Sequence, residues 1–270
     1  RIRKLCFVLA STWLSSAITG LHQLISYSNK KNGKFLLLTS IEKTLFNFVV
    51  ILPLFYVFIS KLEKKMILIG RNLSPFVRRT AAVMNMVNAP YQQKMLSTAD
   101  DQTEIKASNP IGRVPALILP DGETLIDSNA IIDYVIEEFD TSRQLLAIDG
   151  VKRRRILKTT LLAHGVMEKG VAISYEQNRR PKEKIYPEWL MYLEGQLNQG
   201  LDALEKIASS SSEWLHGDTI TVADITTVCL IDYLGIRMPE NMESKGISAL
   251  LALSEKANAI DAIGKTRPNI

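Results

Sequence analysis

Hydrophobic and polar positions follow two different patterns on either side of residue 140. Before it, short apolar runs alternate with polar turns, and this spacing is typical of strands interleaved with helices. The apolar runs predict strands at 67–70, 90–95, 113–119 and 124–126. The intervening and following segments predict helices at 75–88, 103–106 and 129–138. The expected order is a β-α-β unit, a short polar helix and a β-β-α unit.

Beyond a polar linker at 140–150, apolar positions recur at helical spacing to the end of the chain. The pattern predicts helices at 151–178, 187–208, 222–234 and 247–262. An α/β half followed by an all-helical half is therefore the expected fold class. The stretch from Met66 onward is long enough to bury a sizeable core.

Residues 1–65 differ from the rest of the chain in composition. None of the eight methionines precedes Met66, whereas six of the eight phenylalanines do. The apolar run 45–59 is shorter than the roughly 20 residues that cross a bilayer, and no small-residue cleavage site follows it. We interpret residues 1–65 as an upstream extension. It is either a non-native product of a start site assigned too far upstream, or a poorly ordered or membrane-associating segment.

The net charge of the chain changes sign at the same boundary. The whole chain carries +5 at pH 7, and its first 65 residues hold 10 Lys and Arg against 2 Glu. The remainder therefore contains 23 basic and 26 acidic residues, a net charge of −3. Residues 66–270 lack the basic excess of a nucleic-acid-binding domain, and we expect no nucleic-acid partner.

Cysteines and histidines indicate neither a disulfide framework nor a metal site. The sequence has only two cysteines and three histidines. Cys229 lies in an apolar run, which favours a buried, inert thiol and fits a reducing cytoplasm. His164 and His216 have no acidic or cysteine partner at the spacing of metal ligands, so we expect no bound metal.

Ser74-Pro75 is the first of three residue pairs that suggest ligand binding. Proline suits the first turn of a helix, and serine is a favoured N-cap, so capping alone explains the pair. The start of a helix also offers free N–H groups that stabilise an anion such as a thiolate.

Val114-Pro115 and Asp127-Ser128 are the other two pairs. A cis bond at Val114-Pro115 would expose backbone groups with which an extended peptide could pair. Asp127-Ser128 precedes a predicted helix, where it could cap the helix or hold the charged end of an amino acid. A ligand with a thiol, a peptide middle and an amino-acid end fits all three pairs, and glutathione has this composition.

The sequence resembles the cytosolic glutathione S-transferase family, and within it the bacterial YibF-like group. Four segments carry the family resemblance in the expected order and spacing: 74–79, 109–117, 127–134 and 217–225. Arg113 departs from the pattern, because the family usually has lysine there. The resemblance covers residues 66–270 and none of the extension. Segments 165–170, 176–181 and 267–268 resemble the YibF-like group.

The resemblance implies a thioredoxin-like glutathione-binding domain at 66–143 and an all-α helical-bundle domain at 150–270. It also implies a cytoplasmic homodimer that binds glutathione and a small electrophilic substrate. Membrane association is expected only if residues 1–65 belong to the native protein.

The resemblance further implies a role for each of the paired residues. Ser74 would donate a hydrogen bond to the glutathione sulfur. Val114 would pair with the cysteinyl unit through its backbone, next to cis Pro115. Asp127 and Ser128 would hold the γ-glutamyl end.

A second-substrate pocket is expected next to the helix 151–178. Met167, Val171 and Tyr175 recur on one face of that helix, where core packing is the alternative interpretation. The predicted activity is attack of the activated thiol on an electrophile or a peroxide. Two alternatives stay open: a non-catalytic binding module, and a glutathione-dependent disulfide reductase in which Asn72 or Ser74 stabilises the bound sulfur.

Overall fold

The computed structural model describes residues 65–243 and 245–268, which belong to one compact unit. The interpretation of residues 1–65 as an extension lies outside the described residues, apart from the exposed Lys65. In the part of the chain that the structure describes, each helix is too short or too polar to cross a lipid bilayer.

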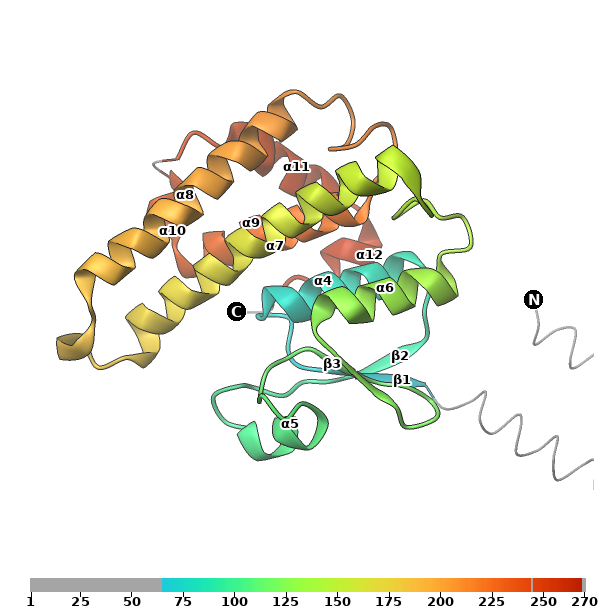
Figure 1. The fold of residues 1–270 in the computed structure, drawn as a ribbon, viewed down its shortest axis with the longest axis horizontal. Helices are drawn as coiled ribbons and strands as arrows, with labels where there is room; N and C mark the ends of the chain where they lie inside the picture. Colours follow the sequence, from blue (N-terminus) through green and yellow to red (C-terminus); the bar gives the residue numbers. More distant parts are fainter. Residues whose placement is uncertain (1–64, 244, 269–270) are drawn as a thin grey trace, which may run out of the picture. The chain divides into compact units, whose positions relative to one another are not determined.

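A four-stranded sheet forms the base of the α/β part (Figure 1). In the order β2-β1-β3-β4, its strands are Tyr91–Lys94, Met66–Ile69, Ala116–Ile118 and Thr124–Ile126. β1 pairs in parallel with β2, and the other two pairs are antiparallel. The predicted order of elements is confirmed, although β2 and β3 are shorter than predicted. The β3–β4 turn contains Gly122 at φ 100°, a conformation that suits glycine.

Helices cover both faces of this sheet. α4 (Pro75–Met86) and α6 (Ser128–Phe139) lie together on one face, and α5 (Gln102–Ser108) covers the other (Figure 1). Successive residues of a strand point to opposite faces. Leu68 therefore packs into the large core that includes α4 and α6, whereas Ile69 packs with the α5 side.

The second part of the unit consists of helices, as predicted. Its central helix α9 (Val222–Arg237) contacts α7 (Gly150–Arg179), α11 (Ser248–Asn258) and α4. α8 (Pro187–Ser209) packs against α7 and α11. Most side chains of α9 are buried, because neighbouring helices cover it on several sides.

The start of α9 is fixed by a capping box formed by Thr221 and Asp224. Asp224 is fully buried and accepts hydrogen bonds from the Thr221 N–H at 2.8 Å and the Thr221 hydroxyl at 2.7 Å. It also accepts from the Leu215 N–H at 2.8 Å, which ties the preceding loop to the helix. Three donors therefore depend on one carboxylate.

The last predicted helix, 247–262, is divided in two. α11 ends at Asn258, and α12 (Asp261–Gly264) begins after Ile260, whose backbone is extended. Ala257 and Ile263 are buried on either side of the break, so the apolar pattern continues through it and does not reveal it. The short helices η2 (Lys182–Lys184) and α10 (Pro239–Glu243) were not predicted either.

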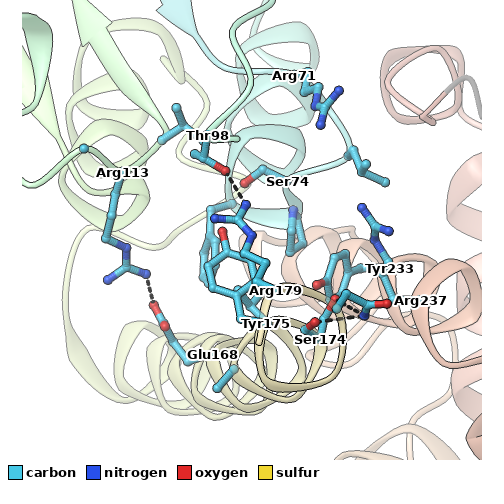
Figure 2. Close-up of a pocket in the computed structure, with 18 of the residues that line it drawn as sticks. Arg71, Ser74, Thr98, Arg113, Glu168, Ser174, Tyr175, Arg179, Tyr233 and Arg237 are labelled. Carbon is cyan, nitrogen blue, oxygen red and sulfur yellow. Dashed lines mark hydrogen bonds and ion pairs between the residues drawn. The ribbon is translucent and has the colours of Figure 1, made fainter. Parts of the chain in front are cut away.

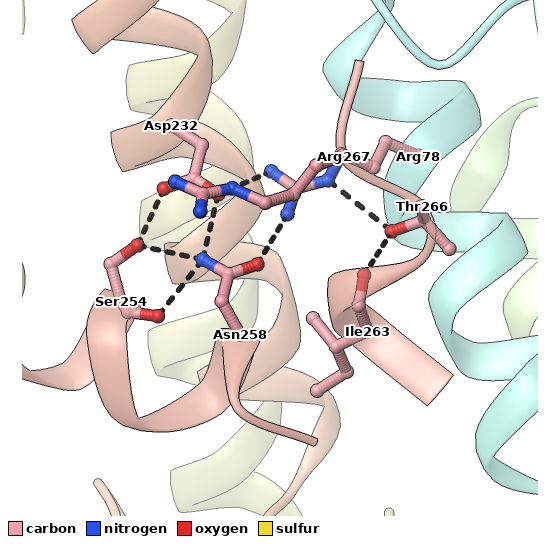
Figure 3. A network of polar contacts seen from close by, with 7 residues as sticks. All are labelled: Arg78, Asp232, Ser254, Asn258, Ile263, Thr266 and Arg267. Atoms are coloured by element: carbon pink, nitrogen blue, oxygen red, sulfur yellow. Dashed lines mark hydrogen bonds and ion pairs between the residues drawn. The ribbon is translucent and has the colours of Figure 1, made fainter. Parts of the chain in front are cut away.

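A buried polar network joins α4 to the helical part (Figure 3). Arg78 forms an ion pair with Asp232 of α9 at 2.7 Å between Nη1 and Oδ2. Its other nitrogens donate to Asn258 at 2.8 Å and to Thr266 at 3.3 Å. Asp232 accepts further hydrogen bonds from Ser254 and Asn258. The network fixes the helix that carries Ser74 at its N-terminus.

Candidate functional site

A pocket of about 410 Å³ opens between the N-terminal end of α4, the C-terminal half of α7 and the C-terminal end of α9 (Figure 2). Ser74, Thr98 and Val114 line it from the α/β part, and Tyr175 and Tyr233 line it from the helical part. The pocket therefore depends on both parts of the unit.

Ser74 is the N-cap of α4 and lines this pocket. Its Oγ accepts a long hydrogen bond from the Val77 N–H at 3.4 Å, so the predicted capping role is present. Because the oxygen is the acceptor in this bond, the hydroxyl hydrogen stays available to donate to a ligand. The unpaired N–H groups at the start of α4 add positive potential at the same place.

The loop before β3 carries Val114 to the pocket. The Val114-Pro115 peptide bond is cis, as predicted. Asn109 holds this loop, because its Nδ2 donates to the Arg113 carbonyl at 2.9 Å and its Oδ1 accepts from the Ile111 N–H at 3.1 Å. β3 begins only after Pro115, so the Val114 backbone lies outside the paired stretch of the strand.

Gly70 allows β1 to end directly against this loop. Its φ is 120°, and a Cβ at this position would lie 2.9 Å from the Cβ of Val114 and 2.6 Å from a methyl group of Val77. These distances are too short for carbon atoms, so a side chain at position 70 would displace the loop or the start of α4.

A smaller pocket of about 70 Å³, lined by Pro115, Asp127 and Ser128, adjoins the first. The two pockets share four lining residues, Phe76, Arg113, Val114 and Glu168. The five residues predicted to contact a ligand therefore lie along two connected depressions, with Ser74 at one end and Asp127 and Ser128 at the other.

Asp127 and Ser128 begin α6 in the smaller pocket. Asp127 is exposed, has φ 70° and accepts a hydrogen bond from the Asn129 N–H at 2.8 Å. The predicted capping by Asp127 is thus present. Ser128 is only 2% exposed, and its Oγ accepts from Arg79 at 3.0 Å. Its hydroxyl hydrogen stays available to a ligand, as at Ser74.

Arg79 holds the start of α6 through hydrogen bonds to Ser128 and Asn129. It is fully buried and donates to Ser128, to Asn129 at 2.9 Å and to Thr226 of α9 at 3.2 Å. Burial lowers its pKa to about 10, and the negative charge of Asp127 opposes this shift. Arg79 therefore remains a cation at neutral pH. The sequence patterns do not single it out, because its partners are 49 to 147 positions away.

Two family models match the chain in the order of its two parts. Residues 68–143 match the glutathione S-transferase N-terminal domain, and residues 164–265 match the C-terminal domain. The chain belongs to the glutathione S-transferase family. The family resemblance seen in the four sequence segments is therefore confirmed.

Similar proteins support this assignment. The glutathione S-transferase-like protein YibF of Escherichia coli is 29% identical over 63% of this chain and 82% of its own. The maleylacetoacetate isomerase of Rhizobium meliloti is 27% identical over 71% of this chain and 90% of its own. A solved glutathione transferase family member from Pseudomonas fluorescens Pf-5, with bound glutathione, is 26% identical. It superposes with a TM-score of 0.67 over 76% of this chain and all of its own.

The three residues predicted for a second-substrate pocket divide into two groups. Val171 and Tyr175 line the large pocket. Met167 does not, because its side chain is fully buried in the core, where it packs as the alternative interpretation expected. The helical spacing places all three residues on one face of α7. It does not show at which residue that face stops contacting the core and begins to line the pocket.

Three arginines that line the large pocket were not identified by sequence reasoning. Arg71, Arg179 and Arg237 line it, and they come from the β1–α4 loop and from the ends of α7 and α9. Their positions in the sequence give no sign that they meet. Among the described residues, no group of three His, Cys, Asp or Glu side chains is placed to hold a metal ion.

Proposed function

We propose that the protein is a glutathione transferase that binds glutathione along the two connected pockets and activates its thiol. The observation that carries this proposal is the placement of the Ser74 hydroxyl, the Val114 backbone and the Asp127-Ser128 pair along one path. In this arrangement the sulfur lies near Ser74. The cysteinyl unit pairs with Val114, and the γ-glutamyl end reaches the start of α6.

The chemistry requires a thiolate next to a site for an electrophile. A hydrogen bond from the Ser74 hydroxyl is stronger to a thiolate than to a thiol, because the acceptor is then charged. The N-terminus of α4 adds to this preference, so the bound thiol has a lowered pKa. The sulfur then bonds to the electrophilic atom, and the leaving group departs with the electron pair of the broken bond. The thiol proton passes to solvent.

Turnover through a protein thiol is not favoured. Cys229 is the one cysteine among the described residues, and it is fully buried in α9. Burial raises the pKa of its thiol to about 11, so it is neither a thiolate at neutral pH nor accessible to substrate. Disulfide reduction would have to use glutathione sulfurs alone. The non-catalytic module also stays as an alternative.

Calorimetric titration with glutathione, followed by three turnover assays, tests the proposal. We expect binding of glutathione and turnover of 1-chloro-2,4-dinitrobenzene or of cumene hydroperoxide. Turnover of hydroxyethyl disulfide alone would favour the reductase, and binding with none of the three activities would favour the non-catalytic module. Absence of glutathione binding would contradict both the transferase and the reductase, and would leave only a non-catalytic module that binds other ligands or protein partners.

Substitutions of Ser74 separate its proposed catalytic role from capping. Ser74→Ala loses both, whereas Ser74→Gly loses the hydroxyl but keeps most of the capping, since glycine is only slightly worse than serine at an N-cap. We expect both variants to lose turnover about tenfold or more, because a hydrogen bond to a charged group contributes about 1.5–3 kcal/mol. Ser74→Thr should retain turnover. If only Ser74→Ala is impaired, and only in its melting temperature, Ser74 is a cap alone.

We also propose a cytoplasmic homodimer. Exposed apolar side chains on α8 fit such a partner surface, namely Trp189, Met191 and Tyr192. We propose no nucleic-acid partner, because residues 66–270 carry a net charge of −3.

A further inference from the structure

The large pocket has an excess of positive charge. Of the described residues that line it, four are arginines and only one, Glu168, is acidic. Glu168 forms an ion pair with Arg113 at 2.8 Å. Among the side chains that the structure describes, which exclude that of Glu243, the other three arginines, at positions 71, 179 and 237, form no ion pair with a carboxylate. The lining thus carries a net charge of +3 without a ligand.

Arg179 is held across the pocket by contacts with both parts of the unit. Its Nη2 donates to the Thr98 hydroxyl at 2.9 Å, and its guanidinium lies 3.8 Å from the centre of the Tyr175 ring (Figure 2). An arginine has five N–H donors, so most of them remain available for an anion. The stacking on Tyr175 fixes the plane of the guanidinium, which favours paired hydrogen bonds to a carboxylate.

Arg237 approaches from the end of α9, beside Tyr233 (Figure 2). The residues proposed to hold glutathione all belong to the α/β part, whereas Arg179 and Arg237 both belong to the helical part. They therefore face the side of the pocket that is left for a second substrate.

A charge count shows that glutathione does not neutralise this pocket. At the sulfur end, bound glutathione brings two negative charges, those of the thiolate and the glycyl carboxylate. Against a lining of +3, about one positive charge remains unmatched. A second substrate with one carboxylate would match it, and a neutral substrate would leave it unpaired.

We propose that the second substrate is an electrophile that carries a carboxylate, held by Arg179 and Arg237; this rests on the proposed transferase function. Iodoacetate and iodoacetamide form a matched pair of probes, because they differ only in the charged group. In each reaction the glutathione sulfur bonds to the methylene carbon while the carbon–iodine bond breaks. Iodide leaves with the electron pair, and the thiol proton has passed to solvent.

The kinetic test compares kcat/KM for the two probes with the full-length chain, each divided by its uncatalysed rate constant. We expect the ratio of the iodoacetate value to the iodoacetamide value to exceed one. Arg237→Gln should lower the ratio about fivefold, the effect of roughly 1 kcal/mol from a partly exposed ion pair. Added salt should lower it as well. Arg180→Gln is the control, because Arg180 pairs with Glu176 and does not line the pocket.

The binding test uses the two products, S-carboxymethylglutathione and S-carbamoylmethylglutathione, in calorimetric titrations. We expect tighter binding of the carboxymethyl conjugate, and loss of this difference in Arg237→Gln. If both probes are conjugated but neither kinetics nor binding distinguishes the charged form, the inference is wrong and the transferase function stands. If no probe is conjugated yet the charged conjugate binds more tightly, the transferase function is wrong, and only a carboxylate-binding site at Arg179 and Arg237 remains of the inference. If the conjugates bind equally or not at all and no probe reacts, both proposals fail.

Discussion

Replacing Asp232 by asparagine should destabilise the protein far more than a change of one atom suggests. The Arg78 and Asp232 side chains are 2% and 9% exposed, so both charges are almost fully removed from water. Asp232→Asn keeps the size of the side chain but leaves Arg78 as an unpaired buried cation. Removing one partner of a buried pair costs about 3–5 kcal/mol, and we expect a loss in this range.

Asp202→Asn is the matched control for this prediction. The Asp202 Oδ1 lies 2.8 Å from the Lys245 Nζ, close to the 2.7 Å between Asp232 and Arg78. The Asp202 side chain, however, is 66% exposed. Water replaces such a partner at little cost, so we expect a loss below about 1 kcal/mol. The free energy of unfolding of both variants can be measured by urea titration, followed by circular dichroism.

The double variant Arg78→Met with Asp232→Asn tests the cause of the loss. If the unpaired cation is responsible, removing it should make the double variant less destabilised than the sum of the two single variants. Additive losses would refute this reasoning. So would a loss in Asp232→Asn that is no larger than the loss in Asp202→Asn.

Three other predictions follow from the structure. Arg79→Gln should raise the KM for glutathione about tenfold with a smaller change in kcat, because it removes a buried cation and a donor to Ser128; steady-state kinetics with varied glutathione checks this. Asp224→Ala should lower the free energy of unfolding by about 3 kcal/mol or more, because it removes a cap and leaves buried N–H groups unpaired; urea titration checks this. Sedimentation should give a mass twice the 30.3 kDa of one chain, and a monomer at micromolar concentration would contradict the proposed homodimer.

Local sequence signals predicted the parts of the fold that depend on neighbouring residues. Ser74-Pro75 marked the start of α4, and Asp127-Ser128 marked the start of α6, because caps act over three or four positions. The break after Asn258 was missed because the apolar pattern continues through it. Breaks of this kind depend on contacts with other elements rather than on spacing along the helix.

The polar side chains of the site could be predicted only where a family pattern contained them. Ser74 and Ser128 have a role in such patterns. Arg79 and Arg179 lie inside the matched segments 74–79 and 176–181, which give them no role, and Arg71 and Arg237 lie outside the matched segments. Arg179 contacts Thr98, a residue 81 positions earlier, and no sequence spacing encodes a contact of this length. The basic character of the pocket was missed for a related reason. Net charge was counted along the chain, where residues 66–270 are acidic overall, whereas the arginines converge only in three dimensions.

Arg78 and Arg79 are consecutive and equally buried, yet their surroundings give them different roles. Arg78 has a carboxylate partner, so its charge is balanced within the protein and contributes to the joining of α4 with α9. Among the described residues, Arg79 donates only to neutral oxygen atoms, those of Ser128, Asn129 and Thr226. Its charge therefore adds to the positive N-terminus of α6, where an anionic ligand would complete the balance. Substitutions at Arg78 should thus act mainly on stability, and substitutions at Arg79 mainly on ligand binding.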